Sequence, residues 1–207
     1  MNNEKYLNDI AEIKEMMNKS SRFISLSGLS GVLAGIYALI GAAYAYTLIY
    51  ENTSIADDYK NLIITQSTAI KLVMVAIMVL FLSILTGFLF SINKAKKRNE
   101  NVWNLASKRL LINFLIPLVT GGIFTLILIE KDIISLVAPA TLLFYGLACL
   151  NASKYTLGDI RYLGISIIFV GLLSTWFLGY GLLFWALGFG VCHIIYGSLM
   201  YFKYDRK

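Results

Sequence analysis

Charged residues are scarce in this chain of 207 residues: Asp, Glu, Lys and Arg make up 14% of it, against ~25% in a soluble domain. Hydrophobic residues make up 58%. A soluble domain cannot bury that much apolar surface, and a disordered chain needs the opposite composition. The 2 Pro exclude a proline-rich or collagen-like chain, and the 2 Cys exclude a disulfide scaffold. The composition therefore predicts an integral membrane protein.

Signatures of catalysis and of metal binding are also missing. The chain has 1 His, so we expect no metal site and no cofactor. It carries no Ser/His/Asp set, phosphate-binding loop, HExxH or CxxC motif, so we expect no catalytic residues and no enzyme. The sequence shows no folded basic domain, so the net charge of +6 does not indicate nucleic acid as a partner.

Charge-free stretches predict the number of membrane spans. Five stretches contain no Asp, Glu, Lys or Arg: 23–50, 72–93, 110–129, 133–153 and 162–202. A helix crosses the bilayer core with ~20 apolar residues, so the first four stretches give one span each. The fifth has room for two, with a turn at Gly179-Tyr180-Gly181. We therefore predict an all-α, polytopic membrane helical bundle of six transmembrane helices, at about 24–50, 70–93, 110–129, 133–152, 160–178 and 182–202.

The positions of Lys and Arg predict the orientation. With six spans, only Lys60, Lys71 and Lys131 of the 18 basic residues lie on one side of the membrane. Because cytoplasmic loops are enriched in Lys and Arg, both termini are expected in the cytoplasm. The expected partners are therefore the lipid bilayer itself and the anionic headgroups that meet the basic 94–109 loop, a loop that contains Trp103 and suits an interfacial helix.

The first 22 residues differ from the rest of the chain. Tyr6, Ile10, Ile13 and Met17 recur at helical spacing within a charged segment, which predicts a cytoplasmic amphipathic helix in 1–22 ahead of the six-span domain at 23–207. This helix either lies along the inner leaflet or docks a partner.

Loop lengths predict how the spans are grouped. Spans three to six are joined by short links, which make sequence neighbours antiparallel neighbours in space. We therefore expect a compact four-helix unit of spans three to six. Spans one and two are attached through longer segments, 51–71 and 94–109, and are expected at the periphery of this unit.

Small residues predict close helix packing. In lipid, helices associate through close backbone approach at Gly, Ala and Ser. The expected packing positions are Ser27, Gly31 and Gly35 in span one, Gly164 and Gly171 in span five, and Gly190 and Gly197 in span six. The ladder in span one serves either packing within the chain or a homodimer seam. Pro117 should kink span three and free a carbonyl, to be met by Thr120 or Thr141 or to line a pocket.

Four runs of the chain carry a resemblance to a family. The runs at 25–41, 108–122, 151–164 and 179–190 resemble those of an uncharacterised family of small bacterial six-span membrane proteins, over nearly the whole chain. The resemblance implies a bacterial plasma (inner) membrane. It implies no activity, so no site residue is carried over.

His193 is the one ionisable residue expected near the middle of the bilayer. We expect a neutral imidazole with a hydrogen-bond partner in another span, and Tyr145 is the first choice. If a ligand pocket exists, His193, Tyr145, Asn113 and Tyr37 are the residues predicted to line it. Metal ligation would require more ligands than one His, and Cys149 and Cys192 could join it only if spans four and six abut.

Two classes of function remain open. The first is a non-enzymatic scaffold, accessory or signalling subunit that acts through helix packing and the N-terminal helix, with a second copy or another membrane protein as its partner. The second is a binder or transporter of a small apolar or lipid-like ligand within the four-helix unit. A cavity that holds His193 would favour the second class.

Overall fold

Six helical rods form the part of the chain that the structure describes. The computed structural model describes residues 6, 23, 26–50, 66–97 and 102–206. Its helices are α2 (Gly28–Tyr50), α3 (Gln66–Lys97), α4 (Leu105–Glu130), α5 (Val137–Ala152), α6 (Ile160–Trp176), α7 (Gly181–Trp185) and α8 (Cys192–Met200). Two π-helical segments, η3 (Ala186–Val191) and η4 (Tyr201–Asp205), continue α7 and α8, so that α7 to η4 is one rod. The 3-10 turns η1 (Ile134–Leu136) and η2 (Ser153–Tyr155) flank α5.

Five of these rods are long and apolar enough to cross a membrane: Gly28–Ile49, Ser67–Lys97, Leu105–Glu130, Ile134–Tyr155 and Gly181–Asp205. The all-α fold and the multi-pass membrane class are therefore confirmed. The sixth rod, α6, lies where span five was predicted but has 17 residues, about 25 Å of helix. The amphipathic helix predicted in 1–22 lies outside the described residues, apart from Tyr6.

The helix ends follow from local sequence. Asn104 caps α4: its side chain accepts from the backbone N–H of Ser107, whose hydroxyl oxygen accepts from the N–H of Asn104. Gly179 has a φ of 98°, so the turn predicted before the last rod does require a glycine. The 94–109 segment was expected to form an interfacial helix, but its beginning is the last turn of α3 and its end is the first turn of α4.

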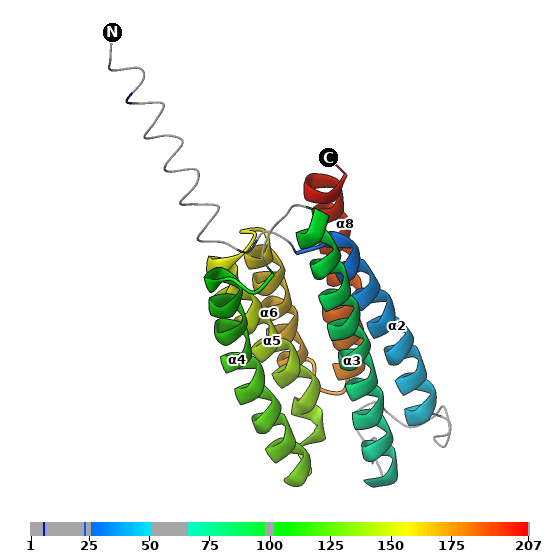
Figure 1. The fold of residues 1–207 in the computed structure, drawn as a ribbon. Coiled ribbons are helices and arrows are strands. Elements are labelled where there is room, and N and C mark those ends of the chain that lie inside the picture. The colour runs from blue at the N-terminus through cyan, green and yellow to red at the C-terminus, as the bar shows by residue number, and fades with distance from the viewer. Residues whose placement is uncertain (1–5, 7–22, 24–25, 51–65, 98–101, 207) are drawn as a thin grey trace.

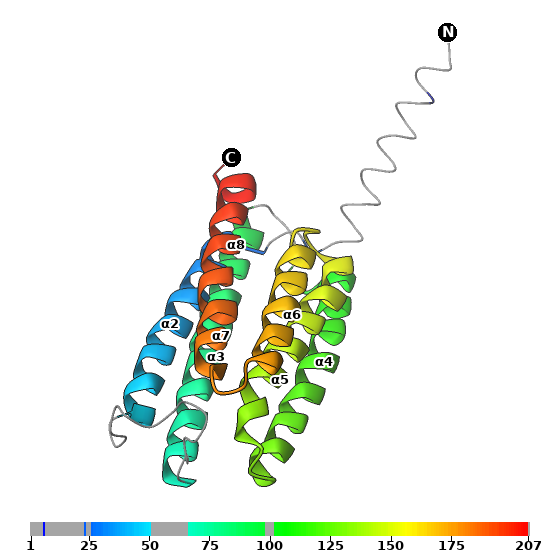
Figure 2. The same cartoon turned by 180° about the vertical axis from the view of Figure 1, so that it is seen from behind.

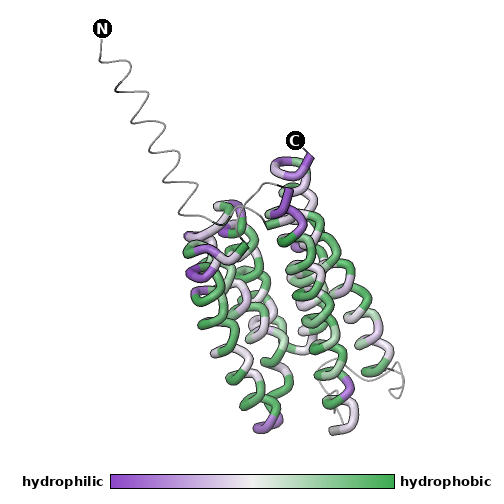
Figure 3. The backbone as a smooth tube through the Cα atoms, in the orientation of Figure 1, coloured by the Kyte–Doolittle hydropathy of each residue, from purple (hydrophilic) through white to green (hydrophobic). Residues whose placement is uncertain are grey.

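Described basic residues gather at one end of the bundle, called here the basic end. Lys94, Lys96, Lys97, Lys108, Arg109, Lys154, Arg161, Lys203 and Arg206 lie there, because α3, α5 and η4 finish at that end and α4 and α6 begin there. Lys71 and Lys131 lie at the opposite end. Figure 3 shows the same pattern, with the hydrophilic segments at the helix ends and apolar helix between them.

The rods form two groups of three. Figures 1 and 2 show α4, α5 and α6 side by side in one group and α2, α3 and the α7–η4 rod in the other. The α7–η4 rod also contacts α5 and α6, but it packs most extensively on α2. The expected compact unit of spans three to six is therefore wrong for span six, which packs more on span one, whereas span one lies at the outer edge of the bundle. Loop length restricts only sequence neighbours, and the glycines of span one decide its partner.

Those glycines bring two backbones together. A Cβ atom built on Gly35 would lie 2.6 Å from the carbonyl oxygen of Gly190, and one on Gly31 would lie 3.2 Å from Cα of Gly197. The span-one ladder therefore packs within the chain, against the last rod. The homodimer alternative for this ladder is not supported, because the ladder is already occupied.

A second seam joins α5 and α6. A Cβ atom on Gly164 would lie 2.8 Å from the carbonyl oxygen of Gly146, and one on Gly171 would lie 3.0 Å from Cγ of Leu143. The nearby core comprises Leu142, Leu163, Ile167 and Val170, with half-buried Tyr145, Phe184, Phe189, Cys192 and Tyr196 around it. This core lies where the two helix groups meet.

Candidate functional site: the His193–Tyr145 pair

His193 and Tyr145 meet at the boundary between the two helix groups. His193 follows the π-helical segment η3 on the last rod, and Tyr145 lies in the middle of α5. The Tyr145 hydroxyl lies 2.8 Å from Nε2 of His193, which is 7% exposed. The expected hydrogen bond between these spans is therefore present.

The second ring nitrogen of His193 fixes the direction of this bond. Nδ1 lies 3.1 Å from the carbonyl oxygen of Gly188, an atom that can only accept, so Nδ1 carries the hydrogen. In a neutral imidazole Nε2 is then the acceptor, and the Tyr145 hydroxyl donates to it. Both ring nitrogens are therefore engaged by protein atoms.

Aromatic rings surround this pair. The Tyr145 ring lies 5.0 Å from the ring of Phe189 and meets the ring of Phe114 edge-on at 5.9 Å. Trp185 lies 5.0 Å from Phe189. Phe114, Trp185 and Phe189 are half-buried, so the group reaches from the core towards the surface. Aromatic pairs at these separations add to the stability of the contact between the groups.

Two further polar side chains lie nearby on the same helices. The Cys149 thiol lies one turn along α5 and is buried. The Tyr196 hydroxyl, one turn along α8, is buried and has no hydrogen-bond partner within the described part of the chain. A buried hydroxyl without a partner is destabilising, so Tyr196 serves as a built-in comparison for Tyr145.

Asn113 lies elsewhere and has a structural partner. Pro117 has no N–H, so it cannot donate to the carbonyl of Asn113 one turn earlier in α4. The side-chain amide of Asn151 on α5 donates to that carbonyl across 2.9 Å. The prediction that Thr120 or Thr141 would serve the freed carbonyl is wrong: their hydroxyls donate to carbonyls in their own helices.

Tyr37 lies on α2, away from the pair. It shares a helix face with Gly41, whose built Cβ atom would lie 2.6 Å from a methyl group of Val79 on α3. Tyr37 therefore faces towards α3, whereas Gly35 faces the last rod. Of the four residues predicted to line a pocket, the structure brings only His193 and Tyr145 together.

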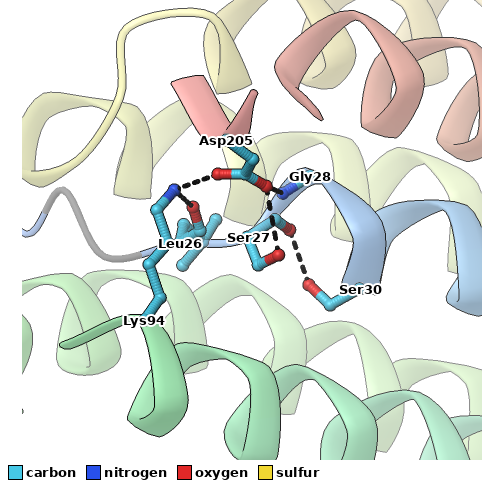
Figure 4. A network of polar contacts seen from close by, with 6 residues as sticks. All are labelled: Leu26, Ser27, Gly28, Ser30, Lys94 and Asp205. Atoms are coloured by element: carbon cyan, nitrogen blue, oxygen red, sulfur yellow. Dashed lines mark hydrogen bonds and ion pairs between the residues drawn. The ribbon is translucent and has the colours of Figure 1, made fainter. Parts of the chain in front are cut away.

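The sequence did not single out the ion pair at the basic end. Lys94 at the end of α3 donates to Oδ1 of Asp205 at 2.5 Å and to the carbonyl oxygen of Leu26 at 2.6 Å. Oδ2 of Asp205 accepts from the N–H of Gly28 at 2.8 Å and from the hydroxyl of Ser27 at 3.2 Å (Figure 4). The Lys94 and Asp205 side chains are 13% and 11% exposed. In the sequence, this ion pair could have been suspected only from Asp205, a single acidic residue within a basic C-terminal segment.

The chain just before α2 also contacts the other helix group. The N–H of Phe23 donates to the carbonyl of Tyr155 at 2.8 Å, and the hydroxyl of Thr156 donates to the carbonyl of Phe23 at 2.6 Å. Phe23 is bound to the α5–α6 turn, whereas Leu26 and Gly28 are bound to Lys94 and Asp205. This short segment therefore fastens the two helix groups to each other at the basic end.

The surroundings of the site contain no cluster of metal-ligating groups in the described regions. No three His, Cys, Asp or Glu side chains among the described residues gather in a way that could hold a metal ion. A cleft of about 650 Å³ lies at the α5–α6 turn instead, and none of the four residues predicted to line a pocket borders it.

Comparison with known proteins gives no relative from which a role could be transferred. No family model matches the chain, and neither a curated protein nor a solved structure matches it. The fold and the long apolar helices show that the chain is an integral membrane protein of the multi-span helical class.

Proposed function

We propose that this protein is a non-enzymatic scaffold or accessory subunit of a bacterial plasma membrane, which binds a partner membrane helix along α3. The observation that carries the proposal is the exposure of α3. This helix has 32 residues, and no residue is buried within its most apolar 18-residue stretch. It packs along α2 and is fixed at its end by Lys94.

The exposure pattern of α3 supports its outer face as the contact surface. Four large apolar residues recur at helical spacing on this face and are between 59% and 63% exposed: Ile77, Phe81, Ile84 and Phe88. Ser83 and Gly87 are half-buried and lie on the side of α3 that packs along α2. The exposed apolar face is therefore the one that is open to a partner helix.

The chemistry of the pair supports a non-enzymatic role. Both ring nitrogens of His193 are engaged by Tyr145 and Gly188, so this side chain holds helices together. The carbonyl freed by Pro117 is likewise satisfied by a neighbouring helix. Polar groups inside the bundle act here as interhelical contacts.

Site-specific photo-crosslinking in the membrane tests the proposal. A photoreactive amino acid at Ile84 or Phe88 on α3 should give adducts with a protein, either a second copy or another membrane protein. Ile116 and Ile123 on α4 are the matched controls, because all four side chains are exposed to a similar degree. Lipid adducts alone at all four positions would contradict the proposal.

The orientation has its own test. The grouping of basic residues at one end supports a cytoplasmic basic end and cytoplasmic termini. Alkaline phosphatase fused after Lys207 should be inactive, and a fusion near Asp57 should be active. An active C-terminal fusion would contradict both this orientation and the six-span count. It would not bear on the proposed contact along α3, which the crosslinking experiment tests.

One observation favours the second candidate function, a binder of a small apolar ligand. The π-helical segment η3 ends at Val191, two residues before His193, and such segments are frequent at functional sites. The half-buried rings of Trp185 and Phe189 lie beside it. Native mass spectrometry of the detergent-extracted protein would show a retained small molecule, and His193→Leu should then lose it while staying folded.

A further inference from the structure

The cleft at the α5–α6 turn lies at the basic end, at the edge of the bundle. Its volume is about 650 Å³, which is in the range of small-molecule sites, ~300–1,000 Å³. Leu150 comes from the last turns of α5, Lys154 from η2, and Arg161 and Tyr162 from the first turn of α6. Both ends of the helical hairpin therefore contribute to one concave surface.

The cleft carries two cations without a partner within the described chain. Neither Lys154 nor Arg161 forms an ion pair or a side-chain hydrogen bond there, and both are exposed. The one acid of the lining, Asp159, is already committed: Lys203 donates to its Oδ2 at 2.7 Å, and so does the Tyr204 hydroxyl at 2.7 Å. The hydrogen bond from Lys203 lowers the pKa of this carboxyl below its ordinary 3.8, which keeps it charged and paired.

The net charge of the cleft is therefore positive. Its two free cations are different groups, the guanidinium of Arg161 and the ammonium of Lys154. A guanidinium donates a planar fork of N–H groups to two oxygens of one phosphate, and an ammonium adds a point charge. The backbone at Gly158 leaves room, because a Cβ atom built there would meet nothing within 4 Å. The lining matches a phosphate group in both charge and geometry.

The apolar part of the lining identifies the source of that phosphate. Tyr162 is 68% exposed and Leu150 is half-buried, and both lie on helix segments next to the charged residues. An aromatic ring at a helix end beside Arg and Lys is the arrangement found at the boundary between headgroups and acyl chains. A free phosphate ion would gain nothing from this apolar flank, whereas a phospholipid places its acyl chains along it.

We infer that this cleft binds the phosphate of an anionic phospholipid, held by Lys154 and Arg161, with the acyl chains running along Tyr162 and Leu150. The site is distinct from the 94–109 segment, where anionic headgroups were expected from sequence. It is also distinct from α3, so a failure of the partner contact at α3 leaves it standing.

The test counts bound lipid on the full chain. The protein is purified in a neutral detergent and titrated with an anionic phospholipid, with a zwitterionic phospholipid of the same chains, or with inorganic phosphate, and binding is followed by native mass spectrometry. We expect one tightly bound anionic lipid, with an affinity that falls at least about tenfold in Lys154→Gln/Arg161→Gln. The control Lys96→Gln/Lys97→Gln removes the same charge from the same end and should retain the affinity.

Each alternative outcome overturns part of the inference. Equal losses in the two double variants would show general attraction to a basic surface and no site in the cleft. Equal binding of the two phospholipids would show that the cleft does not select a net negative headgroup, because a zwitterionic phospholipid also carries an anionic phosphate, and would overturn the assignment to an anionic lipid. Competition by inorganic phosphate as effective as that by lipid would assign the site to a free ion. Arg161→Lys keeps the charge but removes the planar fork of N–H groups, so it should lose part of the affinity for the lipid. An unchanged melting temperature of this variant would show that its fold is intact.

Discussion

The side-chain amide of Asn151 donates to the backbone carbonyl of Asn113 across 2.9 Å, and that carbonyl is the one that Pro117 leaves without its helical donor. A proline in α4 and an asparagine in α5 thus form one unit. Pro117 creates an acceptor on the surface of α4, and Asn151 uses it to join the two helices. The proline is tolerated inside a helix because a neighbour supplies the missing donor.

The coupling between these residues is measurable. Asn151→Leu removes the donor and should cost about 1–3 kcal/mol, because the Asn113 carbonyl loses its partner. Pro117→Ala returns the helical N–H, so Asn151→Leu should cost clearly less in that background. Unfolding of the four proteins in one detergent, analysed as a double-mutant cycle, gives the coupling energy. Equal costs in both backgrounds would show that the two residues act independently.

Tyr145 and Tyr196 provide a matched pair of hydroxyls. Tyr145→Phe removes the donor to His193 and should lower stability by ~0.6 kcal/mol, the average for an interhelical hydrogen bond in a membrane protein. Tyr196→Phe removes a buried hydroxyl that has no partner in the described chain, so it should be neutral or stabilising. The melting temperatures of the two variants in one detergent test this difference. His193→Leu should add little to Tyr145→Phe, and additive losses would show that the pair is not coupled.

Two glycines distinguish close helix packing from open surface. Gly35→Ala places a methyl group 2.6 Å from the Gly190 carbonyl oxygen, so it should destabilise the protein by about 1–3 kcal/mol through overpacking. Gly122→Ala in α4 meets nothing within 4 Å and should stabilise it, by up to ~1 kcal/mol, because alanine is the better helix former. Melting temperatures in the same detergent test the contrast. Equal shifts would mean that α2 does not lie against the last rod.

The buried ion pair at the basic end should be sensitive to loss of one partner. Lys94→Met leaves the Asp205 carboxylate buried without a counterion and should cost about 3–5 kcal/mol. Asp205→Asn in the same background removes that charge and should recover part of the loss. Lys96→Met, on the same turn but exposed, is the control and should change stability little. A loss as small for Lys94→Met as for the control would contradict the pairing.

Acid should weaken the contact between Asp159 and Lys203. The pKa of Asp159 is lowered in the folded protein, so its contribution to stability is present above its ordinary pKa of 3.8 and is lost as the pH falls through the lowered value. The difference in melting temperature between wild type and Asp159→Asn should therefore shrink from about pH 6 to about pH 3.

The sequence by itself determined the class of the protein and most of its helix boundaries. Scarce charge and long apolar runs are local properties of the chain, and they predicted the helical membrane fold. The turn before the last rod was predicted at Gly179-Tyr180-Gly181 because glycine accepts left-handed backbone angles, and Gly179 does adopt one. The His193–Tyr145 bond was predicted because a lone imidazole in lipid requires a partner, and because span four was expected beside span six.

Only the tertiary structure decided which helices lie together and therefore what the polar residues do. Ser27, Gly31 and Gly35 predicted close packing, but a small residue does not specify which neighbour fills the space beside it. That the last rod fills it, through Gly190 and Gly197, placed span one against span six and brought Asp205 to Lys94. Partners that lie far apart in the chain are brought together by packing, and packing in lipid depends on the fit of whole helix surfaces, which no local pattern encodes.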